Sequence, residues 1–224
     1  MPSHTPPPVL DCVRLTAFDA ADLGDVRRAF AAAPEVAMQQ AWRDTPEPTF
    51  ARAVVRAGWR EQSLYVWAAL TDADIFSAAT DHNQRFWELG DAFEMFFQPA
   101  AQAAYVELQV TPNNHRLQLK FPDETWRMRV SKDDAVSKAL MAVETFSSRV
   151  WVEAEAGQWH VLATIPAAAV RETSRDLAGD CWKFSFSRYD YTRGHDAPVI
   201  SSTSPHAQPG FHRLHEFGEL RFQA

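Results

Sequence analysis

Strict alternation of apolar and polar residues marks a series of short segments after Pro48. The clearest segment covers residues 105–111, where Val106, Leu108 and Val110 alternate with polar or amphipathic neighbours. Successive side chains of a β-strand point to opposite faces, so this period of two is typical of a half-buried strand. The same alternation predicts strands over residues 63–70, 91–97, 116–121, 148–155, 159–165, 182–187 and 219–222.

Helix is expected only in short segments. Residues 19–33 predict one short helix, with Asp19 as its N-cap and further aspartates in its first half. Residues 166–175 predict a short helical crossover between strands. The sequence shows no internal repeat and no linker. Many short alternating strands therefore predict a single all-β domain over residues 1–224, an antiparallel two-sheet β-sandwich of immunoglobulin-like or jelly-roll type with short peripheral helices.

Polar side chains recur on one face of several predicted strands. They are Glu94, Glu107, Gln109, Thr111, Gln118, Lys120, Ser185 and Ser187. An antiparallel sheet commonly leaves its second face to solvent, so the pattern fits a solvated outer face as well as a concave binding face.

Charge and composition narrow the classes of function. The 224 residues carry 22 Lys and Arg against 29 Asp and Glu, a formal charge of −7, which disfavours a nucleic-acid partner because phosphate binding needs a basic face. No apolar run approaches 18 residues, so no membrane-spanning helix is expected. The start of the chain lacks a basic and an apolar signal region, and the chain as written is expected to be cytoplasmic.

Cysteines and aromatic residues add two further expectations. Cys12 and Cys181 match no metal-binding or redox spacing, and two free thiols are the expected state, with a disulfide as the alternative. The chain contains 15 Phe, 8 Trp and 4 Tyr. This number of Trp exceeds what one core usually needs, and Trp is a favoured platform for rings and binding hot spots.

Four segments resemble, in the correct order, family 9 carbohydrate-binding modules and their DOMON-like relatives. They are LYVWAALTD at 64–72, WELGDAFEMF at 87–96, ELQVTPN at 107–113 and FHRLHEFGELRF at 211–222. Together they cover about residues 50–222, whereas residues 1–50 match poorly and are treated as an N-terminal extension. The resemblance implies a β-sandwich that binds a mono- or oligosaccharide without cleaving it.

The resemblance also implies a site in which two aromatic rings clamp a sugar over a polar sheet. Carried over by position, Trp87 and Phe211 are the clamp. The implied polar floor consists of Glu94, Gln109, Thr111 and Ser187. Phe211 stands where the family has Trp, and Gln109 stands where its sugar-binding members carry Arg. Pyranose rings present apolar C–H faces to aromatic side chains, and carboxylates form charge-assisted hydrogen bonds with hydroxyl groups.

Three alternatives to a sugar-binding module stay open at this stage. Asp91, Glu94 and Glu107 provide carboxylates for a glycosidase acid–base pair, but no nucleophile elbow, zinc motif or phosphate loop is present, and no catalytic residue is assigned. Some DOMON-like domains bind haem for electron transfer, and Met95 with His115 or His160 could supply such axial ligands. The chain could also be a hydrolase-associated domain that retains no sugar site.

Two metal sites are considered. His206, His212, His215 and Glu216 cluster near the C-terminus and could ligate a transition metal, although solvated loop histidines are the more common case. The family resemblance suggests a structural calcium, with Asp72, Asp74 and Asp81 as the candidate ligands. That segment lacks the dense acidic ligand set of a calcium loop, so neither a metal nor another cofactor is assigned. The oligomeric state is left open.

Overall fold

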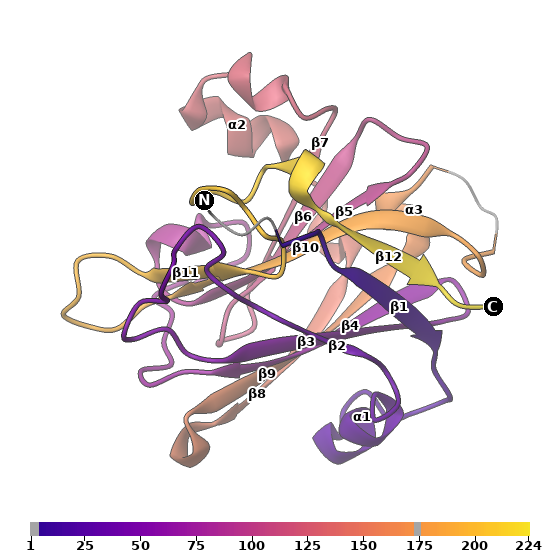
Figure 1. Cartoon of the computed structure of the whole chain (residues 1–224), viewed down its shortest axis with the longest axis horizontal. Coiled ribbons are helices and arrows are strands. Elements are labelled where there is room, and N and C mark those ends of the chain that lie inside the picture. Colours follow the sequence, from indigo (N-terminus) through magenta and orange to yellow (C-terminus); the bar gives the residue numbers. More distant parts are fainter. Residues whose placement is uncertain (1–4, 173–175) are drawn as a thin grey trace.

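The computed structural model describes residues 5–172 and 176–224, and their fold is mostly β (Figure 1). Strands hold 40% of the residues and helices 15%, so the prediction of an all-β fold with short helices is confirmed. The strands are β1 (Val9–Arg14), β2 (Glu35–Ala37), β3 (Ala53–Arg60), β4 (Ser63–Thr71), β5 (Ala92–Pro99), β6 (Tyr105–Val110), β7 (Arg116–Phe121), β8 (Ser147–Glu153), β9 (Gln158–Pro166), β10 (Cys181–Asp190), β11 (Val199–Ser202) and β12 (Gly218–Phe222). The α-helices are α1 (Leu23–Ala29), α2 (Lys132–Ala139) and α3 (Ala167–Val170).

The strands form one continuous sheet of 12 strands within the described residues, rather than two separate sheets. The order β7-β6-β5-β10-β12 makes one half and β3-β4-β9-β8 the other, with β1 between them. The first residues of β1 pair in parallel with β12, and its last two, Val13 and Arg14, pair in parallel with β3. Alternation predicts where strands lie but not which strand they pair with, and β1 itself was not predicted. The expectation of two purely antiparallel sheets is corrected: β1 joins the two halves and pairs in parallel with a strand of each.

The two halves of the sheet enclose one main hydrophobic core. Phe93, Met95 and Phe97 of β5 contribute to it from the first half. Val66 and Ala68 of β4 belong to the same cluster from the second half. All five side chains are fully buried. The alternating positions that predicted these strands therefore point into this core.

The first 50 residues are part of the sheet. They supply β1 and β2, and Figure 1 shows β1 running beside β12, so both ends of the chain meet in one sheet. Helix α1 is shorter than predicted and begins after Asp22, whose Oδ1 accepts a hydrogen bond from the amide of Asp25 at 2.6 Å. The N-cap is thus Asp22 and not Asp19, whose carboxylate accepts from the amide of Ala21 in the preceding turn.

The outer face of the first half carries a second hydrophobic cluster. It contains Phe96, Tyr105 and Phe121 from the strands, together with Phe211 and Phe217 from the segment before β12. This segment, residues 203–217, covers the outer face. Residues 122–146, which include α2, leave the sheet after β7 (Figure 1).

Two polar residues expected on this outer face lie on the opposite side. Gln118 pairs directly with Leu108 and Lys120 with Val106, and directly opposed residues of an antiparallel pair share a face. They therefore share the face of the main core. Alternation within β7 identifies two faces, but only the pairing register with β6 decides which of them carries the polar residues.

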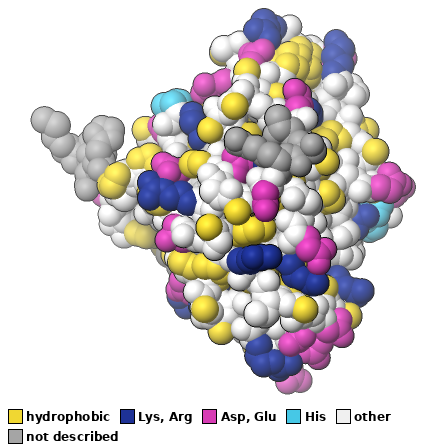
Figure 2. Space-filling model, turned by 90° about the vertical axis from the view of Figure 1, so that its right-hand side faces the viewer, with side chains coloured by type: hydrophobic (Ala, Val, Ile, Leu, Met, Phe, Trp, Pro, Cys, Tyr) yellow, Lys and Arg dark blue, Asp and Glu magenta, His cyan; other side chains and the backbone are white. Residues whose placement is uncertain are grey.

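Other expectations concern single features. Both cysteines are free, and β12 lies between the strands that carry them. None of the described helices is long and apolar enough to span a membrane. Side chains of both charges are interspersed over the face shown in Figure 2. Residues 1–4 of the segment considered for a signal peptide, and residues 173–175 of the predicted crossover, lie outside the described residues.

Candidate functional site

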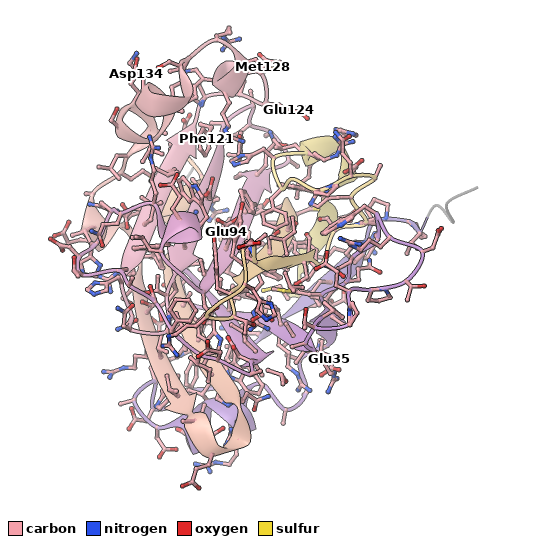
Figure 3. All side chains as sticks on the ribbon, turned by 90° about the vertical axis from the view of Figure 1, so that its left-hand side faces the viewer. Glu35, Glu94, Phe121, Glu124, Met128 and Asp134 are labelled. Atoms are coloured by element: carbon pink, nitrogen blue, oxygen red, sulfur yellow. The ribbon has the colours of Figure 1, made fainter. Side chains whose placement is uncertain are left out.

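A cleft of about 640 Å³ lies over the outer face of β5, β6, β7 and β10. Its lining combines aromatic rings with charged side chains. The lining residues are Arg85, Trp87, Glu88, Glu94, Glu107, Leu119, Phe121, Arg127, Met128, Ala135, Val136, Tyr189, Gln208, Pro209, Gly210, Phe211, His212 and Arg213. In Figure 3, Glu94 lies on the sheet, with Phe121 above it and Met128 near the top of the molecule.

The floor of the cleft is a pair of buried carboxyl groups bridged by an amide. Glu94 of β5 pairs directly with Gln109 of β6, and Glu107 lies two residues before Gln109 on the same face. Gln109 Nε2 donates to Glu94 Oε1 at 2.7 Å and to Glu107 Oε1 at 2.5 Å. Each glutamate is only 3% exposed. The two carboxyl groups are thus held in place by one buried side chain that bonds to both.

His212 and Tyr105 extend this network along the cleft wall. His212 Nε2 lies 3.2 Å from Glu107 Oε2, and its Nδ1 lies 2.9 Å from the hydroxyl of Tyr105. His212 also packs edge-on against the ring of Phe96, at 5.2 Å between ring centroids. The segment before β12 therefore anchors itself to the floor through one histidine.

Burial favours the protonated form of both floor carboxyl groups. It raises the pKa of Glu94 well above its ordinary value, and the neighbouring Glu107 adds to this rise. Burial also raises the pKa of Glu107, to about 7, against the lowering effect of the Gln109 hydrogen bond. The pKa of His212 is lowered well below 6.5, again mainly by burial. The floor therefore offers neutral donors and acceptors rather than a fixed double negative charge.

Aromatic side chains form the walls of the cleft. Trp87 lies in the 3-10 turn Phe86–Glu88 and is partly exposed, and its carbonyl accepts from the hydroxyl of Tyr191 at 2.5 Å. Phe211 is only 4% exposed and packs edge-on against Tyr189, at 5.5 Å between centroids. Phe121 stacks on Tyr105 at 4.8 Å. Trp87 therefore presents more ring surface to a ligand than Phe211 does.

The structure brings some of the expected site residues into the cleft and leaves others outside it. Trp87, Glu94 and Phe211 line the cleft, and Gln109 is buried beside Glu94 without lining it. The remaining two are buried elsewhere, as their hydrogen bonds show.

Thr111 and Ser187 do not line the cleft. The hydroxyl of Thr111 bonds to Asn113 and to the amide of His115, and so closes the turn between β6 and β7. Ser187 is fully buried and donates to Ser202 at 3.2 Å. Both residues lie on strand faces that the alternation identified, but neighbouring segments cover them.

Several cleft residues were not among the residues predicted for the saccharide site. Glu107 lies in the clearest alternating segment, two positions from Gln109, and this spacing was the available signal. Arg127 and Tyr189 gave no such signal, and His212 was considered only as a metal ligand. Arg127 and His212 come from connecting segments that reach the cleft only through the tertiary fold.

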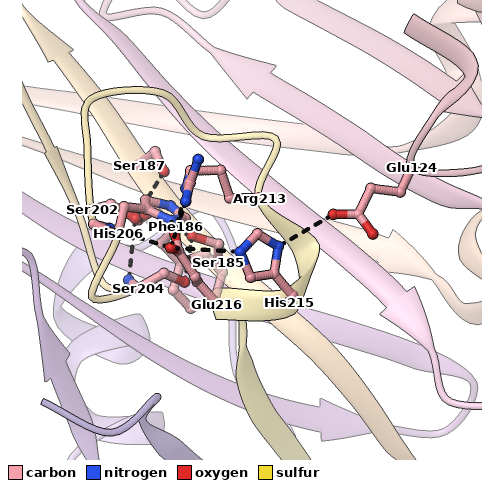
Figure 4. A network of polar contacts seen from close by, with 11 residues as sticks. Glu124, Ser185, Phe186, Ser187, Ser202, Ser204, His206, Arg213, His215 and Glu216 are labelled. Atoms are coloured by element: carbon pink, nitrogen blue, oxygen red, sulfur yellow. Dashed lines mark hydrogen bonds and ion pairs between the residues drawn. The ribbon is translucent and has the colours of Figure 1, made fainter. Parts of the chain in front are cut away.

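The histidines considered as metal ligands do not gather around one point. His206 Nδ1 pairs with Glu216 at 2.8 Å, and Arg213 clamps the same carboxylate through two nitrogens (Figure 4). His215 lies 3.6 Å from the same carboxylate and 3.4 Å from Glu124. His212 instead contacts the cleft floor. Glu216 is therefore engaged by a cation and serves to hold the covering segment together.

The calcium candidates also have separate partners. Asp72 pairs with the buried Arg188 at 2.8 Å, Asp74 with Arg193, and Asp81 accepts from the amide of its neighbour at 2.7 Å. The predicted set is therefore not brought together.

A different acidic group does exist, because single oxygens of Asp72, Asp91 and Asp190 lie within 4.8 Å of one another. Arg188 is also 3.0 Å from Asp190, and both oxygens of Asp91 accept backbone N–H groups. This buried guanidinium supplies positive charge where a cation would, so the arrangement does not fit a calcium site.

The structure gives no support to haem ligation. Met95 is fully buried in the main core, directly opposite Leu108 and Phe186. His115 packs against His82, at 5.3 Å between centroids, and His160 bonds to Glu153 at 2.7 Å. Each histidine has its own partners, and apolar packing encloses the methionine.

Comparisons with known proteins agree with the fold and with the resemblance in the sequence. The model of the carbohydrate family 9 binding domain-like family matches residues 23–224. A solved structure from Bacteroides uniformis, proposed to be a carbohydrate-binding protein, superposes with a TM-score of 0.73 at 16% identity, covering 96% of this chain and 99% of that one. The search of curated proteins gave no match.

Two further similar structures are family 9 carbohydrate-binding modules from Caldicellulosiruptor kristjanssonii. The one in complex with cellotriose has a TM-score of 0.65 at 14% identity, covering 96% of this chain and 94% of that one. The one in complex with glucose has a TM-score of 0.63 at 15% identity, covering 96% of each chain. At these identities the likeness concerns the fold.

Proposed function

The chain belongs to the carbohydrate family 9 binding domain-like family, and we propose that its cleft binds a mono- or oligosaccharide without cleaving it. The observation that carries this proposal is the composition of the cleft. Its floor is a pair of buried, hydrogen-bonded carboxyl groups, and aromatic rings line its walls. The cleft of about 640 Å³ falls in the size range of small-molecule sites.

A sugar needs both kinds of surface. Its hydroxyl groups need donors and acceptors, and Glu94 and Glu107 offer both because a protonated carboxyl donates one hydrogen bond and accepts others. The C–H faces of the pyranose ring need an apolar platform, and Trp87 offers an accessible ring. Phe211 closes the opposite side of the cleft in this proposal. Because its ring is almost fully buried, it contributes more to the packing of the protein than to stacking on the sugar.

Two features support binding rather than hydrolysis. Gln109 Nε2 donates to one oxygen of each carboxyl group, so both acids are already engaged in a structural hydrogen bond. Burial raises the pKa of both groups, which disfavours the ionised form that a nucleophilic carboxylate needs. The relatives solved with cellotriose and glucose suggest gluco-configured sugars as the first ligands to test.

Titration calorimetry with glucose and cellotriose tests the proposal. One stacked ring and a few hydroxyl contacts, less the cost of association, place the dissociation constant between about 1 μM and 1 mM. Trp87→Ala should weaken binding by about 1–3 kcal/mol, the value of one stacked ring. Trp151→Ala is the matched control, because Trp151 lies on β8, in the other half of the sheet.

Two outcomes would overturn the proposal. One is the absence of any heat of binding at tens of millimolar sugar, for these two ligands and a wider panel of saccharides. The other is binding that Trp87→Ala and Trp151→Ala weaken equally, because such binding would not take place in this cleft.

A further inference from the structure

Arg127 brings a positive charge to the mouth of the cleft. It lies in the 3-10 turn Trp126–Met128, it lines the cleft, and its side chain is exposed. Its guanidinium lies over the ring of Phe121, at 6.0 Å from the centroid. In Figure 3 the segment between Glu124 and Met128 lies above Phe121 and Glu94. This contact holds the guanidinium beside a wall of the cleft.

Arg127 forms no ion pair within the part of the chain that the structure describes. The acidic groups around it are engaged elsewhere. Asp123 pairs with Arg129 at 2.7 Å, and Glu124 faces His215 at 3.4 Å. Among the other cations of the cleft, Arg213 is clamped on Glu216 and Arg85 lies 3.6 Å from Glu88.

The floor carboxyl groups form no ion pair with Arg127, although its charge lowers the pKa of both of them against the effect of burial. Glu94 and Glu107 are buried, their carboxyl groups are bridged by Gln109, and Glu94 lies next to a second acid that opposes its ionisation. His212 is held neutral by burial. Arg127 is therefore an exposed cation at the rim of the cleft without a carboxylate partner among the described residues, on a chain whose formal charge is −7.

We propose that the cleft prefers an acidic saccharide, a sugar with a uronic acid carboxylate, and that Arg127 binds this carboxylate. The inference rests on the proposed function and specifies its ligand class. A guanidinium presents parallel N–H groups that match the two oxygens of a carboxylate. In this arrangement the hydroxyl groups of the ring face Glu94 and Glu107, and the carboxylate points to the mouth of the cleft.

The test compares glucuronate, glucose and the methyl ester of glucuronic acid by titration calorimetry at pH 7. An ion pair at an exposed site strengthens binding by up to about fivefold, so glucuronate should bind about two- to fivefold more tightly than glucose. The ester keeps the shape but loses the charge, and it should bind as glucose does. Added salt should reduce the preference for glucuronate.

Arg127→Gln should abolish the preference for glucuronate, so that the variant binds glucuronate and glucose with equal affinity. Arg149→Gln removes an exposed arginine on β8, outside the cleft, and should leave all three affinities unchanged. Equal affinities for glucuronate and glucose in the wild type, or a preference that survives Arg127→Gln, would overturn the inference while saccharide binding stands. Absence of binding for every sugar would overturn the proposed function and the inference with it.

Discussion

Glu107→Gln should make the protein less sensitive to rising pH, because it removes a buried acid that gives up its proton near neutrality. Burial raises the pKa of Glu107 in the folded chain from its ordinary value of 4.5 to about 7. Between these two values the folded chain holds a proton that the unfolded chain has released. Stability from this group is therefore present at low pH and is lost as the pH rises toward 7.

The magnitude follows from the size of the shift. One pKa unit corresponds to about 1.4 kcal/mol, so the cost of holding Glu107 in its site is about 1 kcal/mol at pH 5 and about 3 kcal/mol at pH 8. The glutamine variant does not titrate, and its carbonyl can still accept from Gln109 Nε2. Its free energy of unfolding, relative to wild type, should thus rise by about 2 kcal/mol between pH 5 and pH 8.

Urea unfolding at intervals from pH 5 to pH 8 measures this difference directly, and thermal melts should show it as a relative gain of about 5 °C. The comparison with wild type matters because other groups titrate in the same range. Burial lowers the pKa of His206, and its contribution to stability changes with pH in the opposite direction. Glu155→Gln, an exposed glutamate beyond β8, is the control and should give a flat difference curve. A flat curve for Glu107→Gln as well would refute a buried, protonated floor.

Two further variants test the packing around the site. Phe211→Ala should lower the free energy of unfolding by about 3–5 kcal/mol because its ring is buried, and it should weaken saccharide binding less than Trp87→Ala does. Urea unfolding measures the first effect and titration calorimetry the second. Unchanged stability together with lost binding would contradict the packing role of Phe211. Arg188→Met should lower the free energy of unfolding in urea by about 3–5 kcal/mol, because it leaves Asp72 and Asp190 buried without their cation. An unchanged midpoint of urea unfolding would show that these carboxyl groups are neutral in the folded chain.

Much of the strand content could be predicted because burial on one face leaves a period of two in the sequence. The predicted segment 116–121 coincides with β7, and the segment 63–70 differs from β4 by one residue. Strand β1 was not predicted, since VLDCVR carries only a weak alternation and belongs to the poorly matched first 50 residues. Its pairing with both β12 and β3 depends on contacts across the whole length of the chain.

The site was predictable only where strands carry it. Glu94 and Gln109 lie on alternating strands, and the register of β5 and β6 brings them together. Ser187 lies on the same face, directly opposite Glu94, yet β11 adds Ser202 beside it and removes it from the cleft. Alternation therefore identifies the face of a strand, but the segments that cover that face decide which of its residues a ligand can reach.

The substitution at position 109 links the buried floor to the charge at the rim. The family resemblance places an arginine here in sugar-binding members, and a guanidinium between two carboxylates would keep both ionised. Gln109 can bridge Glu94 and Glu107 but cannot neutralise them, so in this chain burial prevails and protons remain on the floor. The positive charge is instead on Arg127, at the mouth of the cleft and over the ring of Phe121. Gln109 is fully buried, whereas the side chain of Arg127 is exposed at the rim, where a cation can contact the ligand itself. Glutamine in place of arginine at position 109 thus makes the floor a weaker acceptor for hydroxyl groups, and the cation at the rim favours a ligand that carries a carboxylate.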